Sequence, residues 1–140
     1  MANSQQLSGV MKQAALSAVV DSKTLKAALY LASATTNGTN TAYTATGEVS
    51  GTNYTAGGVS VTNGNTAGLT STTAYWTPSA SITYTNVTLS TAFDAVMIYS
   101  TTDTNRNLGV FTFGSQTITA GTFTLTMPTN DSSTGLIRFA

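Results

Sequence analysis

Short segments in which apolar residues alternate with threonine follow one another from residue 24 to the C-terminus, at a spacing of about ten residues. Phe123, Leu125 and Met127, for example, fall on one side of an extended chain, and the intervening threonines fall on the other. Threonine occupies 30 of the 140 positions and favours strands, because its branched β-carbon packs well on a pleated surface. The sequence therefore predicts an all-β fold, an antiparallel β-sandwich of the jelly-roll kind, although the pattern does not distinguish this strand order from that of a closed barrel.

Nine segments are predicted as strands, and some of them carry specific expectations. Leu25–Leu31 alternates so that one face is buried, whereas Phe93–Tyr99 is apolar on both sides and is expected at the centre of a sheet. Gln116–Ala120 and Thr122–Met127 flank Gly121, which predicts a hairpin there. The remaining predicted strands are Val59–Val61, Leu69–Trp76, Ser81–Leu89, Leu108–Phe113 and Leu136–Phe139.

The N-terminal segment has a different pattern. Residues 4–20 contain three glutamines and no threonine. Their helical spacing predicts a helix capped by Ser4, although Gly9 weakens it by roughly 1 kcal/mol relative to alanine. The expected organisation is a helix or arm at 1–23 and a β-sandwich domain at 24–140; the helix either closes one end of this domain or docks on a neighbouring subunit. The apolar stripe consists of Leu7, Val10, Met11, Ala14 and Ala18.

Several classes of enzyme are excluded by composition. The chain has no cysteine and no histidine, which removes the usual zinc sites, cysteine nucleophiles and histidine-based triads. Its five acidic residues are far apart in sequence, so each is interpreted as a turn or surface residue, and Asp103 is expected to pair locally with Arg106. The glycine patterns of a Rossmann fold or a P-loop are also missing. We therefore expect a non-enzymatic protein with no catalytic residue, no cofactor and no metal site.

Charge is scarce, since five basic and five acidic residues give a net charge of zero. This composition does not favour binding to nucleic acid or to a membrane, and we recognise neither a membrane span nor an export signal. The 45 residues between Glu48 and Asp94 and the 24 between Arg106 and Asp131 are uncharged. A neutral hydroxyl and amide surface favours burial against identical neighbours or within a larger assembly. The alternative is a small β domain with a hydroxyl-rich coat.

The aromatic residues allow two interpretations. Six tyrosines and one tryptophan are distributed along the chain, and Tyr75 and Trp76 are adjacent. Aromatic rings on a β fold can form a sugar-binding platform, but they more often fill the core with their polar groups hydrogen-bonded.

Most of the chain after residue 24 resembles a group of small virion proteins of tailed bacteriophages. The most specific stretch is GEVSG at 47–51 followed by YTAGG at 54–58. The resemblance implies a non-enzymatic structural protein of the virion. The other matching stretches are LKAALY at 25–30, TAYTAT at 41–46, AVMIY at 95–99, Asn105-Arg106, Phe113-Gly114, GTFTL at 121–125 and IRFA at 137–140.

Together these observations lead us to expect a capsid decoration or cement protein on the phage head. It would contact the major capsid protein and further copies of itself, as a homotrimer, through many modest contacts repeated by symmetry. One alternative is a head-to-tail or tail component, such as a fibre-attachment piece, and an alternative of another class is a host-glycan-binding module. The candidate assembly contacts are Leu7, Val10, Met11, Tyr75 and Trp76.

Overall fold

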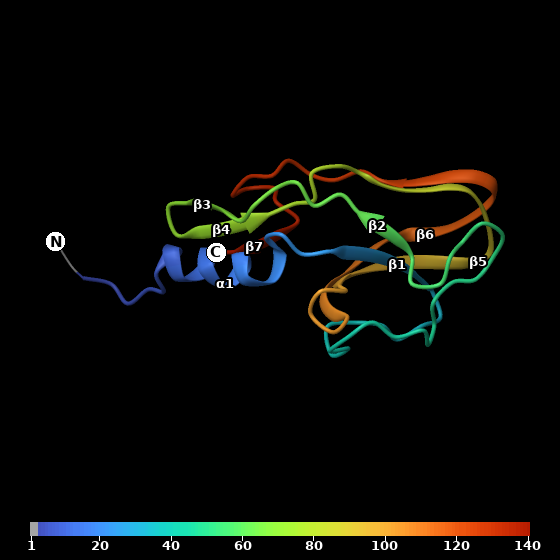
Figure 1. Ribbon diagram of the computed structural model, residues 1–140, viewed down its shortest axis with the longest axis horizontal. Coiled ribbons are helices and arrows are strands. Elements are labelled where there is room, and N and C mark those ends of the chain that lie inside the picture. The colour runs from blue at the N-terminus through green and yellow to red at the C-terminus, as the bar shows by residue number, and fades with distance from the viewer. Residues whose placement is uncertain (1–2) are drawn as a thin grey trace. The chain divides into compact units, whose positions relative to one another are not determined.

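The computed structural model describes residues 3–140, and its elements are labelled in Figure 1. Strands account for 45% of the chain and form two antiparallel sheets, which confirms the prediction of an all-β, sandwich-like fold with a short N-terminal helix. The elements are α1 (Gly9–Val20), β1 (Leu25–Leu31), β2 (Val59–Val61), β3 (Gly68–Thr70), β4 (Thr73–Trp76), β5 (Ile82–Ser100), β6 (Arg106–Leu125) and β7 (Ile137–Phe139).

The chain folds into two compact units, each with its own sheet. The sheet unit comprises Lys23–Thr62 and Ala80–Thr126 and contains a four-stranded sheet in the order β2-β1-β5-β6. The helical unit comprises Met1–Ser22, Asn63–Ser79 and Met127–Ala140 and contains α1 and a three-stranded sheet in the order β3-β4-β7. The helix therefore shares its unit with Asn63–Ser79 and Met127–Ala140, two segments that the sequence analysis assigned to the β-sandwich domain. Because a jelly roll has eight strands in two Greek keys, only the coarser sandwich-like prediction holds.

A single long hairpin, β5–β6, replaces five of the shorter strands that were predicted. The chain reverses at the turn of residues 101–105. The hairpin predicted at Gly121 is wrong, because Gly121 lies inside β6 opposite Val87. Register shifts interrupt the ladder there, and the φ angles of Asn86 and Ala120 are 50° and 45°. Such irregularities bend paired strands without ending them, so the chain bends where a turn was expected.

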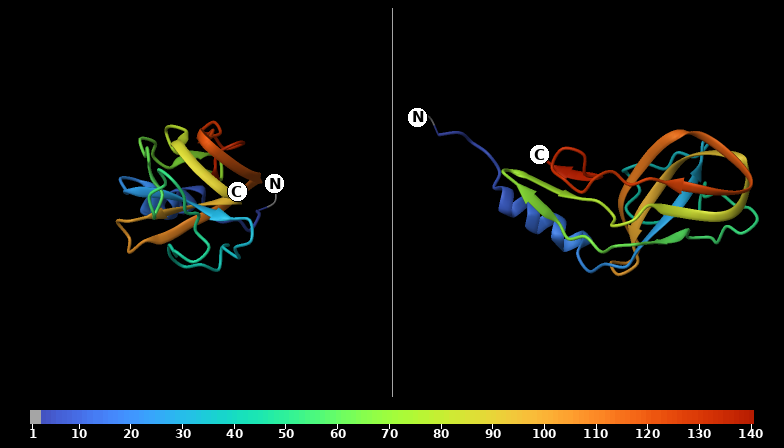
Figure 2. Two further views of the ribbon diagram at one scale, coloured as in Figure 1. Left: turned by 90° about the vertical axis from the view of Figure 1, so that its right-hand side faces the viewer. Right: turned by 90° about the horizontal axis from the view of Figure 1, so that it is seen from above.

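The bent hairpin folds over itself within the sheet unit, as the right-hand view of Figure 2 shows. The ring of Phe93 meets those of Phe123 and Phe113 edge-on, with centroids 5.1 Å and 6.0 Å away. The Tyr84 hydroxyl donates a hydrogen bond to the Ala27 carbonyl at 2.8 Å, which ties the far half of the hairpin to β1. These aromatic contacts form the part of the core that lies between the two halves.

β1 is more deeply buried than its sequence predicts. Ala28 and Tyr30 pack with Met97 and other residues of β5 on one side, although the sequence placed these two residues on an exposed face. Ala27 and Leu29, which alternate with them, are also fully buried. The strand lies between β2 and β5, so both of its edges are paired, and burial of both alternating sets of side chains shows that both of its faces are covered. The prediction that residues 93–99 are central is confirmed, since this part of β5 pairs with both β1 and β6.

Helix α1 packs on β3 and β4 through a face other than the predicted one. It begins at Gly9, and Ser8 precedes it without a side-chain capping bond, so the cap predicted at Ser4 is wrong. Its buried residues are Gly9, Lys12, Leu16 and Val20, whereas the predicted apolar stripe is exposed.

The docking of α1 depends on a close approach to the turn between β3 and β4. This turn, at residues 71–72, also divides the single strand predicted over Leu69–Trp76. A Cβ atom at Gly9 would lie 2.7 Å from the Ser71 carbonyl oxygen. The Lys12 ammonium donates to the Thr72 carbonyl at 3.1 Å. The buried face contains a glycine and a lysine, so a search for apolar residues at helical spacing does not detect it. This explains why the sequence analysis predicted the wrong face of the helix.

Replacing Gly9 with alanine therefore tests the helix docking. Helix propensity favours alanine by about 1 kcal/mol, but the clash with backbone at Ser71 outweighs it, and we expect a net loss of about 1–2 kcal/mol in the free energy of unfolding. Urea denaturation of Gly9→Ala and of the control Gly38→Ala, whose added Cβ would meet nothing within 4 Å, measures this. A Gly9→Ala protein at least as stable as the wild type would contradict the account.

Candidate functional site

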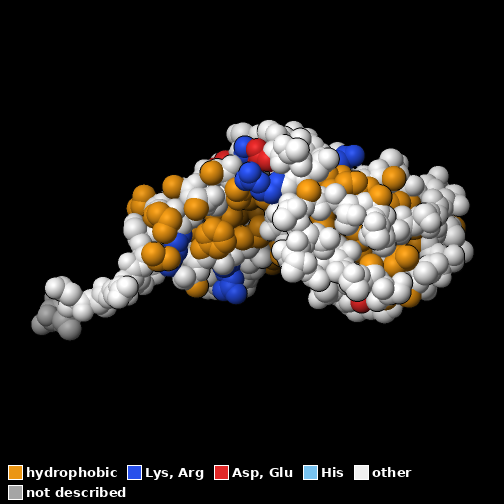
Figure 3. All heavy atoms as spheres, turned by 90° about the horizontal axis from the view of Figure 1, so that it is seen from below, with side chains coloured by type: hydrophobic (Ala, Val, Ile, Leu, Met, Phe, Trp, Pro, Cys, Tyr) orange, Lys and Arg blue, Asp and Glu red, His pale blue; other side chains and the backbone are white. Residues whose placement is uncertain are grey.

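All five candidate assembly contacts lie in the helical unit, and three of them are at its surface. Leu7, Val10 and Met11 are 63%, 67% and 47% exposed, although each is large and apolar. Val10 and Met11 lie in the first turn of α1, and Leu7 lies in the segment just before it. Hydrophobic side chains gather over this part of the surface next to the N-terminal segment (Figure 3). We call Leu7, Val10 and Met11 the helix patch.

An open hollow of about 460 Å³ adjoins the helix patch. Its shape is fixed by two hydrogen bonds between α1 and the segment before β3. The Gln13 side-chain amide donates to the Ala67 carbonyl at 2.9 Å, and the Ala67 N–H donates to the Asp21 carboxylate at 2.7 Å. The residues that line the hollow are Val10, Gln13, Ala14, Ser17, Asp21, Thr66 and Ala67.

The other two candidates have structural roles. Trp76 is fully buried, and its indole N–H donates to the Asn65 carbonyl at 3.3 Å, so its ring forms neither an assembly contact nor a sugar platform at this surface. Tyr75 is half-buried and lies across from Gly68, whose missing side chain leaves room for the tyrosine ring. The core interpretation of Trp76 is the correct one.

Sequence reasoning missed an exposed aromatic residue near the C-terminus. Phe139 is 40% exposed and stands opposite Ala74 in the β7–β4 pair. The alternating pattern of residues 136–139 correctly predicted a strand. A pattern of four residues does not indicate which face of that strand is exposed to solvent.

A second cluster, in the sheet unit, surrounds the carboxylate of Glu48. The hydroxyl of Tyr43 donates to one carboxylate oxygen at 2.6 Å. The hydroxyl of Tyr54 and the N–H of Gly57 donate to the other at 2.8 Å and 2.7 Å. The Tyr54 hydroxyl also accepts the N–H of Leu29 at 3.0 Å. The interpretation of Glu48 as a simple turn or surface residue was therefore wrong.

This cluster holds the loop between β1 and β2 against the sheet. Residues 47–49 add backbone hydrogen bonds to the end of β1, from the Leu31 N–H to the Gly47 carbonyl and from the Val49 N–H to the Leu29 carbonyl. The Tyr99 hydroxyl donates to the Gly57 carbonyl at 2.8 Å. The contacts use the GEVSG and YTAGG stretches of the resemblance, whose glycines permit this loop shape.

Burial is the main cause of raised pKa values among the tyrosines of the sheet unit. It raises the pKa of Tyr30 to about 12. Burial, followed by the hydrogen bond to Glu48, raises the pKa of Tyr43, and burial together with Glu48 also raises the pKa of Tyr54 and Tyr84. These hydroxyls therefore remain protonated donors at an alkaline pH at which an exposed tyrosine ionises, which suits a network that stabilises structure.

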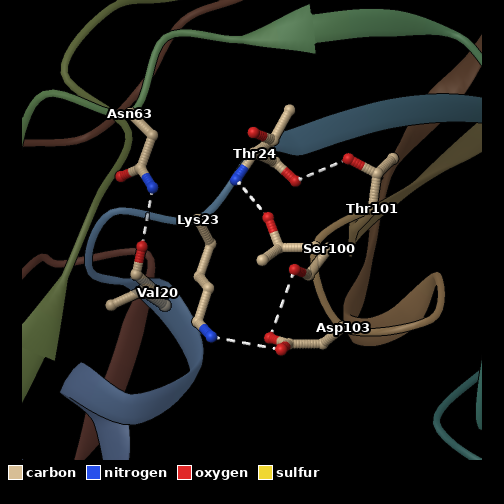
Figure 4. A network of polar contacts seen from close by, with 8 residues as sticks. Val20, Lys23, Thr24, Asn63, Ser100, Thr101 and Asp103 are labelled. Atoms are coloured by element: carbon tan, nitrogen blue, oxygen red, sulfur yellow. Dashed lines mark hydrogen bonds and ion pairs between the residues drawn. The ribbon is translucent and has the colours of Figure 1, made fainter.

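Asp103 pairs with a residue other than the one expected from sequence. Its carboxylate accepts a hydrogen bond from the Lys23 ammonium at 3.1 Å and one from the Ser100 hydroxyl at 3.3 Å (Figure 4). The hydrogen bond from Lys23 is the main cause that lowers the pKa of Asp103. The expected pair with Arg106 is therefore replaced by a contact between the start of β1 and the β5–β6 turn.

Within residues 3–140, no group of three or more acidic, histidine or cysteine side chains is placed to hold a metal ion. The described part of the chain contains no helix of the length and hydropathy needed to cross a membrane. Comparison with protein-family models, with curated proteins and with solved structures finds no match to the chain.

Glu48→Ala tests the structural importance of the carboxylate. The substitution leaves the hydroxyls of Tyr43 and Tyr54 and the N–H of Gly57 without their acceptor, so we expect a loss of about 2–4 kcal/mol in the free energy of unfolding. Asp94→Ala is the matched control, because it also removes one acid from the sheet unit, and it should change stability by less than about 0.5 kcal/mol. Chemical denaturation measures both variants. Equal effects would show that Glu48 is an ordinary surface acid.

The tyrosine network also predicts loss of stability at alkaline pH. Unfolded tyrosines ionise near pH 10, while the folded chain keeps Tyr30 protonated up to a pKa of about 12. Between these values the unfolded state has released protons that the folded state retains, so stability falls as pH rises, and it is fully present below pH 10. Urea denaturation at pH 8, 9 and 11 should show a plateau followed by a fall. The fall should be shallower in Tyr30→Phe; identical slopes would refute the contribution of Tyr30.

Proposed function

We propose that the chain is a non-enzymatic structural protein of a tailed-bacteriophage virion. In this role it decorates the head and bridges subunits of the major capsid protein, with further copies of itself as neighbours. The observation that carries the proposal is the helix patch, in which three large apolar side chains are exposed within and just before a helix whose other face is used in docking. The resemblance at residues 47–51 and 54–58 supports the phage setting.

The helix patch is suited to burial against a partner. Leu7 lies two residues before α1, and Val10 and Met11 lie in its first turn. Each side chain would gain about 1–2 kcal/mol if a partner covered its exposed surface. The hollow next to the helix patch is a concave surface that a side chain of the partner can fill. These are features of a site for protein contact, since the polar groups there are already bonded within the chain.

The surface composition supports the same role. Exposed residues of β6 are mostly threonine, serine and glutamine, and its one charged residue is Arg106, at its start. Burying hydroxyl and amide groups costs less than burying charges. Many weak contacts of this kind, repeated over a symmetric shell, add up to tight binding.

A head-to-tail or tail component would use the same surface, and copy number distinguishes it from a decoration protein. The glycan-binding alternative loses its main support, because Trp76 lies in the core.

Occupancy of the particle tests the proposal. In phage carrying the triple variant Leu7→Ser, Val10→Ser and Met11→Ser, we expect at least a tenfold loss of this chain from purified particles, because the docking surface becomes polar. Quantitative mass spectrometry of the particles measures this loss.

The matched control is the double variant Ala15→Ser and Ala18→Ser, which changes exposed alanines of the same helix and keeps the helix patch. It should retain wild-type occupancy. Thermal unfolding of each purified variant separates misfolding from loss of docking. A folded triple variant with unchanged occupancy would contradict the proposed docking surface.

A further inference from the structure

The outer edge of β6 is uncovered over most of its length. The order β2-β1-β5-β6 places β6 at the end of the four-stranded sheet. Its first residues are covered by the loop before Glu48, since Ala42 pairs with Arg106 and the Asn107 N–H donates to the Thr41 carbonyl at 3.1 Å. Beyond residue 107 and within the described residues 3–140, the backbone of β6 pairs with no strand other than β5, and the Gly114 carbonyl accepts a hydrogen bond from the Gln116 side-chain amide at 3.1 Å.

Residues 109–112 form the most regular part of this edge, and Phe113 follows them at a register shift. Four successive pairs, from Gly109 opposite Ile98 to Thr112 opposite Ala95, follow without a register shift. The ring of Phe111 covers Gly109, because a Cβ atom added at Gly109 would lie 2.9 Å from that ring. This is the geometry of an extended strand, in which residues two apart share one face. In such a strand alternate N–H and C=O groups point away from the partner strand. Residues 109–113, the 109–113 edge, therefore offer backbone groups for pairing.

The 109–113 edge carries no charged residue and no proline, although register shifts lie on either side of its regular pairs. Edge strands commonly carry lysine or proline, which repel or block another strand. Arg106 is the one charged residue of β6, and Pro128 follows only after the strand has ended. Val110, Phe111 and Phe113 are half-buried in the single chain, so pairing would bury more of their apolar surface.

We propose that the 109–113 edges of two copies pair antiparallel about a two-fold axis at Phe111. The two four-stranded sheets then become one continuous sheet of eight strands. The uncharged edge favours a second copy as its partner, because two identical edges bring no like charges together. Arg106, the one charged residue of β6, lies outside the paired residues. A two-fold contact uses the same surface on both copies and closes at a dimer.

This inference is independent of the capsid proposal and differs from it in symmetry. The sequence as a whole led us to expect a homotrimer, whereas pairing of this edge forms a dimer. Its failure leaves the role of the helix patch unaffected, because the helix patch lies in the other unit.

Sedimentation analysis of the purified full-length chain tests the proposal. Wild type is expected to be a concentration-dependent dimer. Thr112 is exposed and lies one residue from the proposed axis, so the two copies of residue 112 are diagonal neighbours, about 7–8 Å apart. Thr112→Lys should weaken dimerisation at least tenfold through like-charge repulsion, and Thr112→Glu should do the same. Thr112→Ser and the loop variant Thr39→Lys, which adds the same charge elsewhere, should dimerise like wild type.

Mixing the two charged variants gives the decisive result and distinguishes charge repulsion from misfolding. An equimolar mixture of Thr112→Lys and Thr112→Glu should recover dimers, because lysine and glutamate then meet across the axis; unfolded variants would not recover. A wild-type chain that is monomeric at every accessible concentration, or trimeric, overturns the proposal. So does a dimer that Thr112→Lys leaves unchanged, or a mixture that stays monomeric while each variant is folded.

Discussion

The bend of the β5–β6 hairpin is the constraint on which the sheet unit depends. A straight hairpin of this length would expose its aromatic residues to water. Because the strands bend near Asn86 and Ala120, the far half returns over the near half and Phe93 meets Phe123. The same bend brings Tyr84 to the carbonyl of Ala27. Ala27 and Leu29 are buried as the alternation predicts, and Ala28 and Tyr30 on the other face of β1 are buried too, against Met97 and Tyr99 of β5.

The scarce charges of the chain are used largely inside it. Glu48 holds the β1–β2 loop, Asp21 accepts the N–H of Ala67, and Lys12 reaches the backbone at the β3–β4 turn. Lys23 and Asp103 bond to each other. This leaves a surface made mainly of hydroxyl, amide and apolar groups. Such a surface loses little hydration energy when another protein covers it, which is the physical link between the composition and the proposed structural role.

The sequence predicts fold class well because period-two alternation is a local signal. The central position of residues 93–99 and the short strands β2 and β7 follow from it. It fails at Gly121, because a bend inside a long strand carries the same glycine and threonine pattern as a turn between two short strands. Only pairing with a distant strand distinguishes the two.

The candidate site was predictable only in part, for similar reasons. The exposed residues Leu7, Val10 and Met11 stand out as apolar in the sequence, but a stripe of this kind equally predicts a buried face. Trp76 and Tyr75 are adjacent in sequence and have different surroundings, because alternate residues of a strand face opposite ways. The partners of Glu48 lie within nine residues of it, but neither the two tyrosine hydroxyls nor the backbone N–H of Gly57 forms a recognised motif with a carboxylate at these spacings.

The central claim is that this chain belongs to the shell of a phage particle, and its copy number there tests the claim most directly. Quantitative mass spectrometry of purified particles gives the ratio of this chain to the major capsid protein. The account predicts a ratio near one copy per capsid subunit. A few copies per particle would move the chain to the tail or its connector, and absence from the particle would contradict a virion role altogether.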